Sequence, residues 1–164
     1  MRLQRRDTVK RLLVGVYNYA LCRPVAEVLS RLGAEHVLVV HSEDGLDEIS
    51  AAAPTHVAEA KPGELREYDV SPEDLGVERT SLDGLEVDSA LESLELIRMA
   101  LSGAPGERAD RARRVVALNA GAALYVAGLA ESLADGVTEA RRLLASGTPW
   151  AKVEALADLT AGFA

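Results

Sequence analysis

The chain has 164 residues, of which 48% are hydrophobic, and it carries a formal net charge of −8. This length and hydrophobic content suffice for one core, and the negative charge argues against general nucleic-acid binding, which depends on clustered Lys and Arg. No apolar run approaches the roughly 18 residues of a membrane span, and residues 1–6 lack the apolar core of a signal peptide. The single cysteine, Cys22, suits a reducing compartment and resembles a buried structural thiol, so we expect a cytoplasmic protein.

Basic residues crowd the first eleven positions, ahead of an acidic body. They are Arg2, Arg5, Arg6, Lys10 and Arg11. We interpret residues 1–11 as a basic N-terminal arm and residues 12–164 as a single α/β domain. Two interpretations of the arm stay open, contact with phosphate or a solvated terminus.

The first part of the chain predicts a strand, a helix and a second strand. The apolar runs 12–17 and 36–40 predict the strands, and apolar residues at helical spacing in 21–32 predict the helix. Such a crossover unit places its two strands in parallel. Gly15, inside the first run, indicates a bulge or the close approach of another backbone segment.

A hairpin and a helical second half follow this unit. Residues 55–60 and 64–70 flank Lys61-Pro62-Gly63, a turn signal that predicts antiparallel strands. The fold class we expect is α/β, with a mixed, mostly parallel sheet, covering helices and a helix-rich C-terminal half. In the last helix, which starts at Thr148-Pro149, Trp150, Val153 and Leu156 are expected to face inward. The earlier helical stripes contain Ala90, Leu94, Ile97 and Leu101, then Ala112, Val115, Val116, Ala122, Ala123 and Val126, then Val137, Ala140 and Leu144.

Four carboxylates surround Gly45 in the stretch from His41 to Ser50, directly after the second strand. Ligands of open α/β sheets bind beyond the carboxyl ends of the strands, so chemistry is expected in this loop. A glycine loosens the backbone, and Asp47 and Glu48 can then turn toward one divalent cation that is shared with substrate phosphates. The alternative is an ordinary solvated acidic loop.

Histidines and one asparagine are further polar candidates. Neither His41 nor His56 has a second His or Cys at metal-ligand spacing, so no zinc site is expected, and His41 either touches a ligand or bonds the backbone. Asn119 interrupts an apolar helical stripe, so its amide must find partners, either by pinning a neighbouring loop or by contacting a ligand. The small residues Ala120 and Gly121 indicate close packing against another element.

Several segments, in order along the chain, resemble the anthranilate phosphoribosyltransferases. The match begins at about Leu12 and corresponds to roughly the C-terminal half of a family member. The segments that carry it are Leu13-Val14-Gly15-Val16-Tyr17, Arg23-Pro24-Val25-Ala26-Glu27-Val28-Leu29, residues 39–50 around Asp44-Gly45-Leu46-Asp47-Glu48, Pro54-Thr55-His56-Val57-Ala58-Glu59, Arg66-Glu67-Tyr68, Pro72-Glu73-Asp74-Leu75-Gly76 and residues 118–128.

The resemblance implies an enzyme of tryptophan biosynthesis that transfers a phosphoribosyl group from phosphoribosyl pyrophosphate to anthranilate with the help of Mg²⁺. By carry-over, Asp47 and Glu48 hold the magnesium ion on the diphosphate, while His41, Asp44 and Gly45 belong to a possible site loop. No catalytic residue is assigned in this chain. The family's Gly-Thr-Gly-Gly-Asp phosphate loop, its Lys-His-Gly-Asn segment and its anthranilate-orienting arginine belong to the half that precedes Leu12.

We therefore expect the isolated chain to be weakly active or inactive. It is expected to form a homo-oligomer, or to need the complementary N-terminal half, through the surface beside the first strand and the acidic loop. No nucleic acid and no membrane are expected as partners. Two alternatives stay open, a non-catalytic binding or assembly module derived from the same fold, and a metal-dependent enzyme of another kind.

Overall fold

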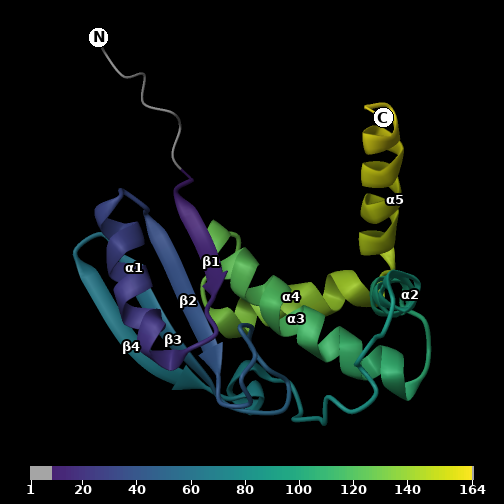
Figure 1. Ribbon diagram of the computed structural model, residues 1–164, viewed down its shortest axis with the longest axis horizontal. Coiled ribbons are helices and arrows are strands. Elements are labelled where there is room, and N and C mark those ends of the chain that lie inside the picture. Colours follow the sequence, from purple (N-terminus) through teal and green to yellow (C-terminus); the bar gives the residue numbers. More distant parts are fainter. Residues whose placement is uncertain (1–8, 164) are drawn as a thin grey trace.

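The computed structural model describes residues 9–163, which contain a four-stranded mixed sheet and five α-helices (Figure 1). The strands are β1 (Arg11–Gly15), β2 (His36–Ser42), β3 (Thr55–Lys61) and β4 (Glu64–Val70), and they are ordered β1-β2-β3-β4. The α/β class, the mixed sheet and the helix-rich second half are confirmed.

Within residues 9–163, parallel pairing is limited to β1 with β2, where Leu13 lies opposite Leu38. β2 pairs with β3 and β3 with β4 in antiparallel fashion. The expected "mostly parallel" character therefore does not extend beyond the first pair. The reason is that a loop without a crossover helix joins β2 to β3, and parallel neighbours need such a crossover.

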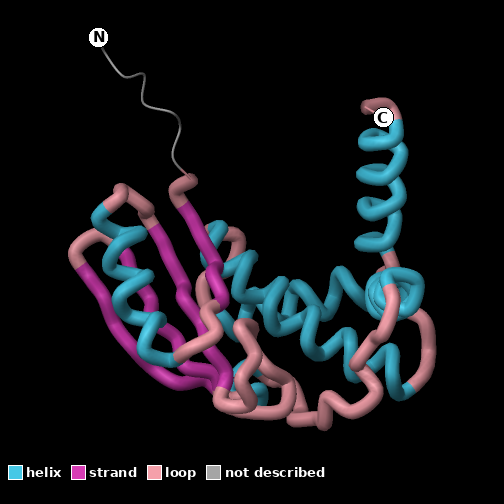
Figure 2. The backbone as a smooth tube through the Cα atoms, viewed as in Figure 1, coloured by secondary structure: helices cyan, strands magenta, loops and turns pink. Residues whose placement is uncertain are grey.

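The helices lie on both faces of the sheet (Figure 2). α1 (Cys22–Arg31), which follows a short 3₁₀ turn at Tyr19–Leu21, packs on β2 and β3. α3 (Glu107–Ala127) packs on the opposite face, over β1 and β2, and α4 (Leu133–Ala145) packs against α3. A 3₁₀ turn at Pro72–Leu75 follows β4 and contacts α4.

β2 is the central strand of the core because both of its faces are covered. Val37 and Val39 pack with α1 residues such as Cys22 and Ala26, whereas Leu38 and Val40 pack with side chains of α3. All four β2 side chains are at most 1% exposed. The continuous apolar run that predicted a strand covered on both faces is thereby explained.

The crossing of α3 and α4 depends on two glycines. A methyl group added at Gly121 would lie 2.5 Å from Cα of Val137, and one added at Gly136 would lie 2.2 Å from the carbonyl oxygen of Gly121. The close packing expected at Gly121 is confirmed, and it lets the two backbones approach as larger side chains would not allow.

The two remaining helices correct one expectation. α2 (Ala90–Leu101) buries only Ala100, and α5 (Thr148–Ala161) buries no residue and extends away from the rest of the molecule (Figure 1). Trp150 and Val153 are half-buried, but Leu156 is 60% exposed, so the inward face predicted for the last helix is wrong at that position. Apolar spacing shows which face of a helix favours burial, but the described residues place nothing under the outer part of α5.

Most of the predicted basic arm, residues 1–11, lies outside the described residues, which begin at position 9. Arg11, the last residue assigned to it, is instead the first residue of β1, and its Nη1 donates to the carbonyl of Val126 at 2.9 Å. Within residues 9–163, no helix is long and apolar enough to cross a bilayer.

Candidate functional site

The acidic loop leaves β2 at its carboxyl end, next to the carboxyl end of the parallel strand β1. β2 is two residues longer than predicted, so His41 belongs to the strand and the loop begins at Glu43. Asp47 and Glu48 are exposed, and neither carboxylate takes part in a hydrogen bond or ion pair within the described part of the chain. Both are therefore available to a ligand.

The other carboxylate considered for the site, Asp44, is used inside the loop. It accepts a hydrogen bond from Ser50 Oγ at 2.5 Å and one from the Leu46 amide at 3.4 Å. Gly45 follows with φ of +90°, in the left-handed region that favours glycine. Since Asp44 already holds the loop together, it has less freedom to bind a cation than Asp47 or Glu48.

His41 bonds the backbone of the neighbouring strand segment. Its Nδ1 donates to the carbonyl oxygen of Val16 at 2.8 Å, which fixes the ring beside the end of β1. Its side chain is half-buried. Of the two interpretations of this histidine, the structure shows the backbone contact.

Asp47 lies against β1 at Gly15. A methyl group at Gly15 would lie 1.6 Å from the carbonyl oxygen of Asp47, so no side chain fits between the two backbones. The close approach that Gly15 indicated in the sequence is confirmed, and its partner is the acidic loop.

Asn119 of α3 holds the same loop from the other side. Its Oδ1 accepts from the Ile49 amide at 2.9 Å, and its Nδ2 donates to the Ile49 carbonyl at 2.9 Å and to the Val115 carbonyl at 3.0 Å. Ile49 itself is 1% exposed and packs in the core between the sheet and α3. The half-buried Asn119 therefore links the helix to the residue that follows Glu48.

The donor set of the loop fits part of a magnesium shell. Mg²⁺ is commonly bound through one or two carboxylates, with waters and substrate phosphates completing an octahedron. Residues 9–163 contain no group of three or more His, Cys, Asp or Glu side chains placed to hold a metal ion. Asp47 and Glu48 can therefore contribute two ligands, but not a complete cage.

A buried carboxylate network at the other end of β2 was not predicted from the sequence. Glu59 of β3 is 1% exposed and accepts hydrogen bonds from His36, Tyr125, Lys61, Arg66 and Tyr68. Burial by itself raises the pKa of Glu59, but the hydrogen bonds, of which the Tyr68 bond has the largest effect, outweigh burial and lower the pKa to about 2. The signal available in the sequence was a carboxylate inside a buried strand, with Arg66 and Tyr68 alternating on the facing strand.

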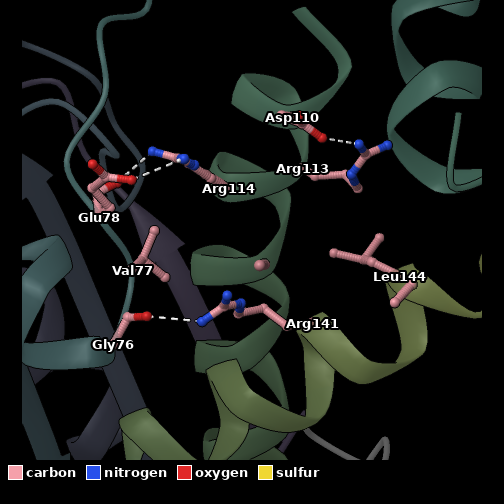
Figure 3. Close-up of a pocket in the computed structure, with 10 residues that line it drawn as sticks. Gly76, Val77, Glu78, Asp110, Arg113, Arg114, Arg141 and Leu144 are labelled. Carbon is pink, nitrogen blue, oxygen red and sulfur yellow. Dashed lines mark hydrogen bonds and ion pairs between the residues drawn. The ribbon is translucent and has the colours of Figure 1, made fainter. Parts of the chain in front are cut away.

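A hollow lies elsewhere, between the segment after the 3₁₀ turn and the helices α3 and α4 (Figure 3). Its volume is about 390 Å³, and none of the acidic-loop residues lines it. Arg114 donates to the carbonyl and carboxylate of Glu78 at 3.0 and 3.2 Å, and Arg141 donates to the Gly76 carbonyl at 2.8 Å. Because these arginines already fasten the segment to the helices, the acidic loop is the better candidate site.

Comparison with known proteins identifies the family. Residues 4–150 match the family described as "Glycosyl transferase family, a/b domain". The chain is 55% identical over 153 residues to an anthranilate phosphoribosyltransferase of Saccharophagus degradans, covering 93% of this chain and 45% of that protein. It is 56% identical over 155 residues to the enzyme of the same name from Pseudomonas syringae, covering 94% and 44%. The resemblance noted in the sequence is confirmed, and the chain spans less than half the length of these relatives.

Solved structures agree with the fold. Anthranilate phosphoribosyltransferase from Thermus thermophilus superposes with a TM-score of 0.74 at 37% identity, covering 85% of this chain and 40% of that one. The Saccharomyces cerevisiae enzyme, solved in complex with PRPP and Mg, superposes with a TM-score of 0.73 at 22% identity, covering 87% and 40%. At that identity, the yeast structure supports the fold alone.

Proposed function

The chain belongs to the glycosyl transferase family, a/b domain, and from this premise we propose that it forms the acidic-loop part of an anthranilate phosphoribosyltransferase. The observation that carries the proposal is the position of Asp47 and Glu48. Two exposed carboxylates without partners in residues 9–163 follow the central strand, where α/β sheets bind their ligands. Their donor chemistry suits Mg²⁺ bound to a diphosphate.

In the proposed reaction, the amino nitrogen of anthranilate attacks C1 of the ribose of phosphoribosyl pyrophosphate. The bond from C1 to the pyrophosphate oxygen breaks, pyrophosphate leaves with the electron pair, and the nitrogen loses a proton. Bound Mg²⁺ supplies positive charge that neutralises the departing pyrophosphate. Asp47 and Glu48 would hold that cation, and residues 9–163 would contribute no nucleophile or general base of their own.

The site is divided, in this proposal, between this chain and the part of the relatives that it does not span. We infer that the glycine-rich phosphate loop, its following segment and the residue that orients anthranilate come from that part. The isolated 164 residues then have little or no activity. We expect the reaction to take place in the cytoplasm, in keeping with a single buried cysteine.

Exposed apolar side chains support the need for a second polypeptide. Leu91 of α2 is 79% exposed, and Leu94 and Ile97 are about half exposed. On and just beyond α5, Leu159 and Phe163 are 63% and 82% exposed. β1 is an edge strand of the sheet, so both an open backbone edge and apolar helix faces are available for assembly. We propose the complementary half as the partner, and a second copy of this chain as the competing occupant.

A reconstitution assay tests the function. Formation of phosphoribosyl anthranilate is measured with both substrates and Mg²⁺ for the chain alone, and for the chain mixed with the remaining part of the Saccharophagus degradans relative. We expect no turnover alone and turnover in the mixture, and loss of that turnover with the double variant Asp47→Asn, Glu48→Gln.

Two results would count against the proposal. Catalysis by the isolated chain at the rate of an intact enzyme would overturn the division of the site. An associated mixture, seen as a defined complex by light scattering but without turnover, would favour the non-catalytic assembly module that the exposed helix faces also suit.

A further inference from the structure

The carboxylates of Asp47 and Glu48 are not held by contacts of their own side chains. Neither forms a hydrogen bond or ion pair within residues 9–163, and both are exposed. Their relative orientation therefore depends on the backbone on which they stand. Loops are more mobile than the elements that they connect, so this backbone keeps one conformation only where contacts with other parts of the chain restrain it.

Two backbone contacts, one on each side, flank the pair of carboxylates. On the N-terminal side, the carbonyl of Asp47 lies so close to Gly15 of β1 that a methyl group there would be 1.6 Å away. On the C-terminal side, the amide and the carbonyl of Ile49 are both bonded to Asn119 of α3, each at 2.9 Å. The Ile49 side chain is buried beneath this contact. Only Glu48 lies between these two contact residues, Asp47 and Ile49.

The Asn119 contact needs a primary amide. The Ile49 N–H requires an acceptor and the Ile49 carbonyl requires a donor, and one Asn or Gln side chain offers both. A third bond, from Nδ2 to the Val115 carbonyl one turn earlier, fixes the amide on its own helix. An aspartate at this position would still accept from the N–H, but would place negative charge beside the Ile49 carbonyl.

We propose that Asn119 is a positioning residue for the cation site, which sets the orientation of Asp47 and Glu48 through the backbone of Ile49. The inference rests on the proposed function, because it assumes that these carboxylates meet a divalent cation. It adds a residue 70 positions away in the sequence, on a helix, to a site otherwise built from a single loop. Residues that orient metal ligands commonly affect metal affinity by about 10-fold to 100-fold when they are changed.

The test combines hydrogen exchange with binding of Mn²⁺, used as a probe in place of Mg²⁺. Exchange protection of the amides of residues 47–49, and broadening of their NMR signals by millimolar Mn²⁺, are compared in the wild-type chain, Asn119→Ala and Asn119→Asp. The matched control is Tyr125→Phe, on the same helix, which removes a bond to Glu59 at the opposite end of the sheet. Far-UV circular dichroism checks that each variant is folded, and Asn119→Asp, which keeps the size and the acceptor, serves if Asn119→Ala does not fold.

We expect protection at Ile49 to be lost in Asn119→Ala and reduced in Asn119→Asp, whose carboxylate repels the Ile49 carbonyl. Both variants should bind Mn²⁺ at least 10-fold more weakly, whereas Tyr125→Phe keeps the wild-type response to Mn²⁺. Unchanged exchange at residues 47–49 in the Asn119 variants, or a looser loop with unchanged Mn²⁺ binding, would overturn the positioning role. Equal weakening by Tyr125→Phe would reduce the effect to general destabilisation and overturn it as well. Failure of the proposed function looks different, because the wild-type chain itself would then show no Mn²⁺ response at Asp47 and Glu48.

Discussion

Carboxylates lie near both ends of β2, buried and hydrogen-bonded at one end and exposed at the other. Near its first residue, Glu59 of the neighbouring strand is buried and accepts hydrogen bonds from five side chains. After its last residue, Asp47 and Glu48 are exposed and have no side-chain partner in the described part of the chain. The same chemical group thus stabilises the fold at one end and is left available at the other.

The difference follows from the cost of burying charge. A buried carboxylate is tolerated only when donors satisfy it, and Glu59 has donors from β2, β3, β4 and α3. A carboxylate that must bind and release a cation needs open coordination positions, so its own contacts must be few and its backbone must be held instead. Asn119 holds that backbone through hydrogen bonds to Ile49, and Gly15 leaves room for it to pack against β1.

The largest effect on stability is expected from Glu59→Ala. It leaves Lys61 and Arg66 without their buried counter-charge and several hydroxyl and ring donors without an acceptor, which costs about 3–5 kcal/mol. Urea denaturation measures the loss. The control is Glu64→Ala, an exposed residue on the same hairpin, which should change stability by less than about 0.5 kcal/mol. A loss of less than about 1 kcal/mol for Glu59→Ala would contradict the claim that the buried Glu59 network stabilises the fold.

Gly15→Ala tests the other end of the strand. The new methyl group meets the Asp47 carbonyl oxygen at 1.6 Å, so the loop or β1 must move, at a cost of about 3 kcal/mol or more. Thermal unfolding measures the cost. Gly162→Ala, at an exposed position with an ordinary negative φ, should leave the unfolding temperature unchanged. Wild-type stability of Gly15→Ala would show that the close packing of the loop against β1 is not needed for the fold.

Acid should destabilise the protein mainly through the Glu59 network. The pKa of Glu59 is about 2 in the folded state, below its ordinary value of 4.5, so the unfolded state takes up the proton first. The stabilisation is complete above pH 4.5 and is lost as the pH falls toward 2, by about 3 kcal/mol. Burial lowers the pKa of His36 below 6.5, despite the opposing hydrogen bond to Glu59. The unfolded state therefore protonates this histidine first, and stability falls as the pH drops below 6.5, in the same direction as for Glu59.

Denaturation at a series of pH values measures this acid limb. Glu59→Gln keeps the size of the side chain but cannot titrate, and its stability should vary much less between pH 4.5 and 2 than that of the wild-type chain. An equally steep acid limb in Glu59→Gln would assign the pH dependence to other groups.

Local sequence patterns predicted the elements well, but could not predict what each element would meet. The apolar run of β2, the Pro-Gly hairpin and the glycine at position 15 each reflect a local backbone requirement, and all three are found in the structure. The partner of Asn119 and the donors of Glu59 come from residues distant in the sequence, which periodicity does not pair. Leu156 shows the reverse case, since its spacing marks an apolar face whether or not anything covers it.

The smallest effect on stability, and the clearest on binding, is expected from Asp47→Asn combined with Glu48→Gln. Neither side chain has a partner to lose within residues 9–163, so the free energy of unfolding should change by less than about 0.5 kcal/mol. Two carboxylates supply only part of an octahedral shell, so calorimetry of the wild-type chain should find Mg²⁺ or Mn²⁺ affinity that is on the order of millimolar or too weak for calorimetry to detect. Millimolar Mn²⁺ should still broaden the NMR signals of residues 47–49 in the wild-type chain, and this broadening should vanish in the double variant.

Asp44→Asn is the matched control for this variant. It weakens the bond from Ser50 inside the loop, which should cost about 1 kcal/mol of stability, while Asp47 and Glu48 keep their carboxylates and continue to broaden with Mn²⁺. The two variants are thus expected to have opposite effects. The double variant loses cation binding and keeps its stability, whereas Asp44→Asn loses some stability and keeps cation binding. Persistent Mn²⁺ broadening in the double variant would mean that these exposed carboxylates are ordinary solvated side chains, and the contrast between the two ends of β2 would concern stability alone.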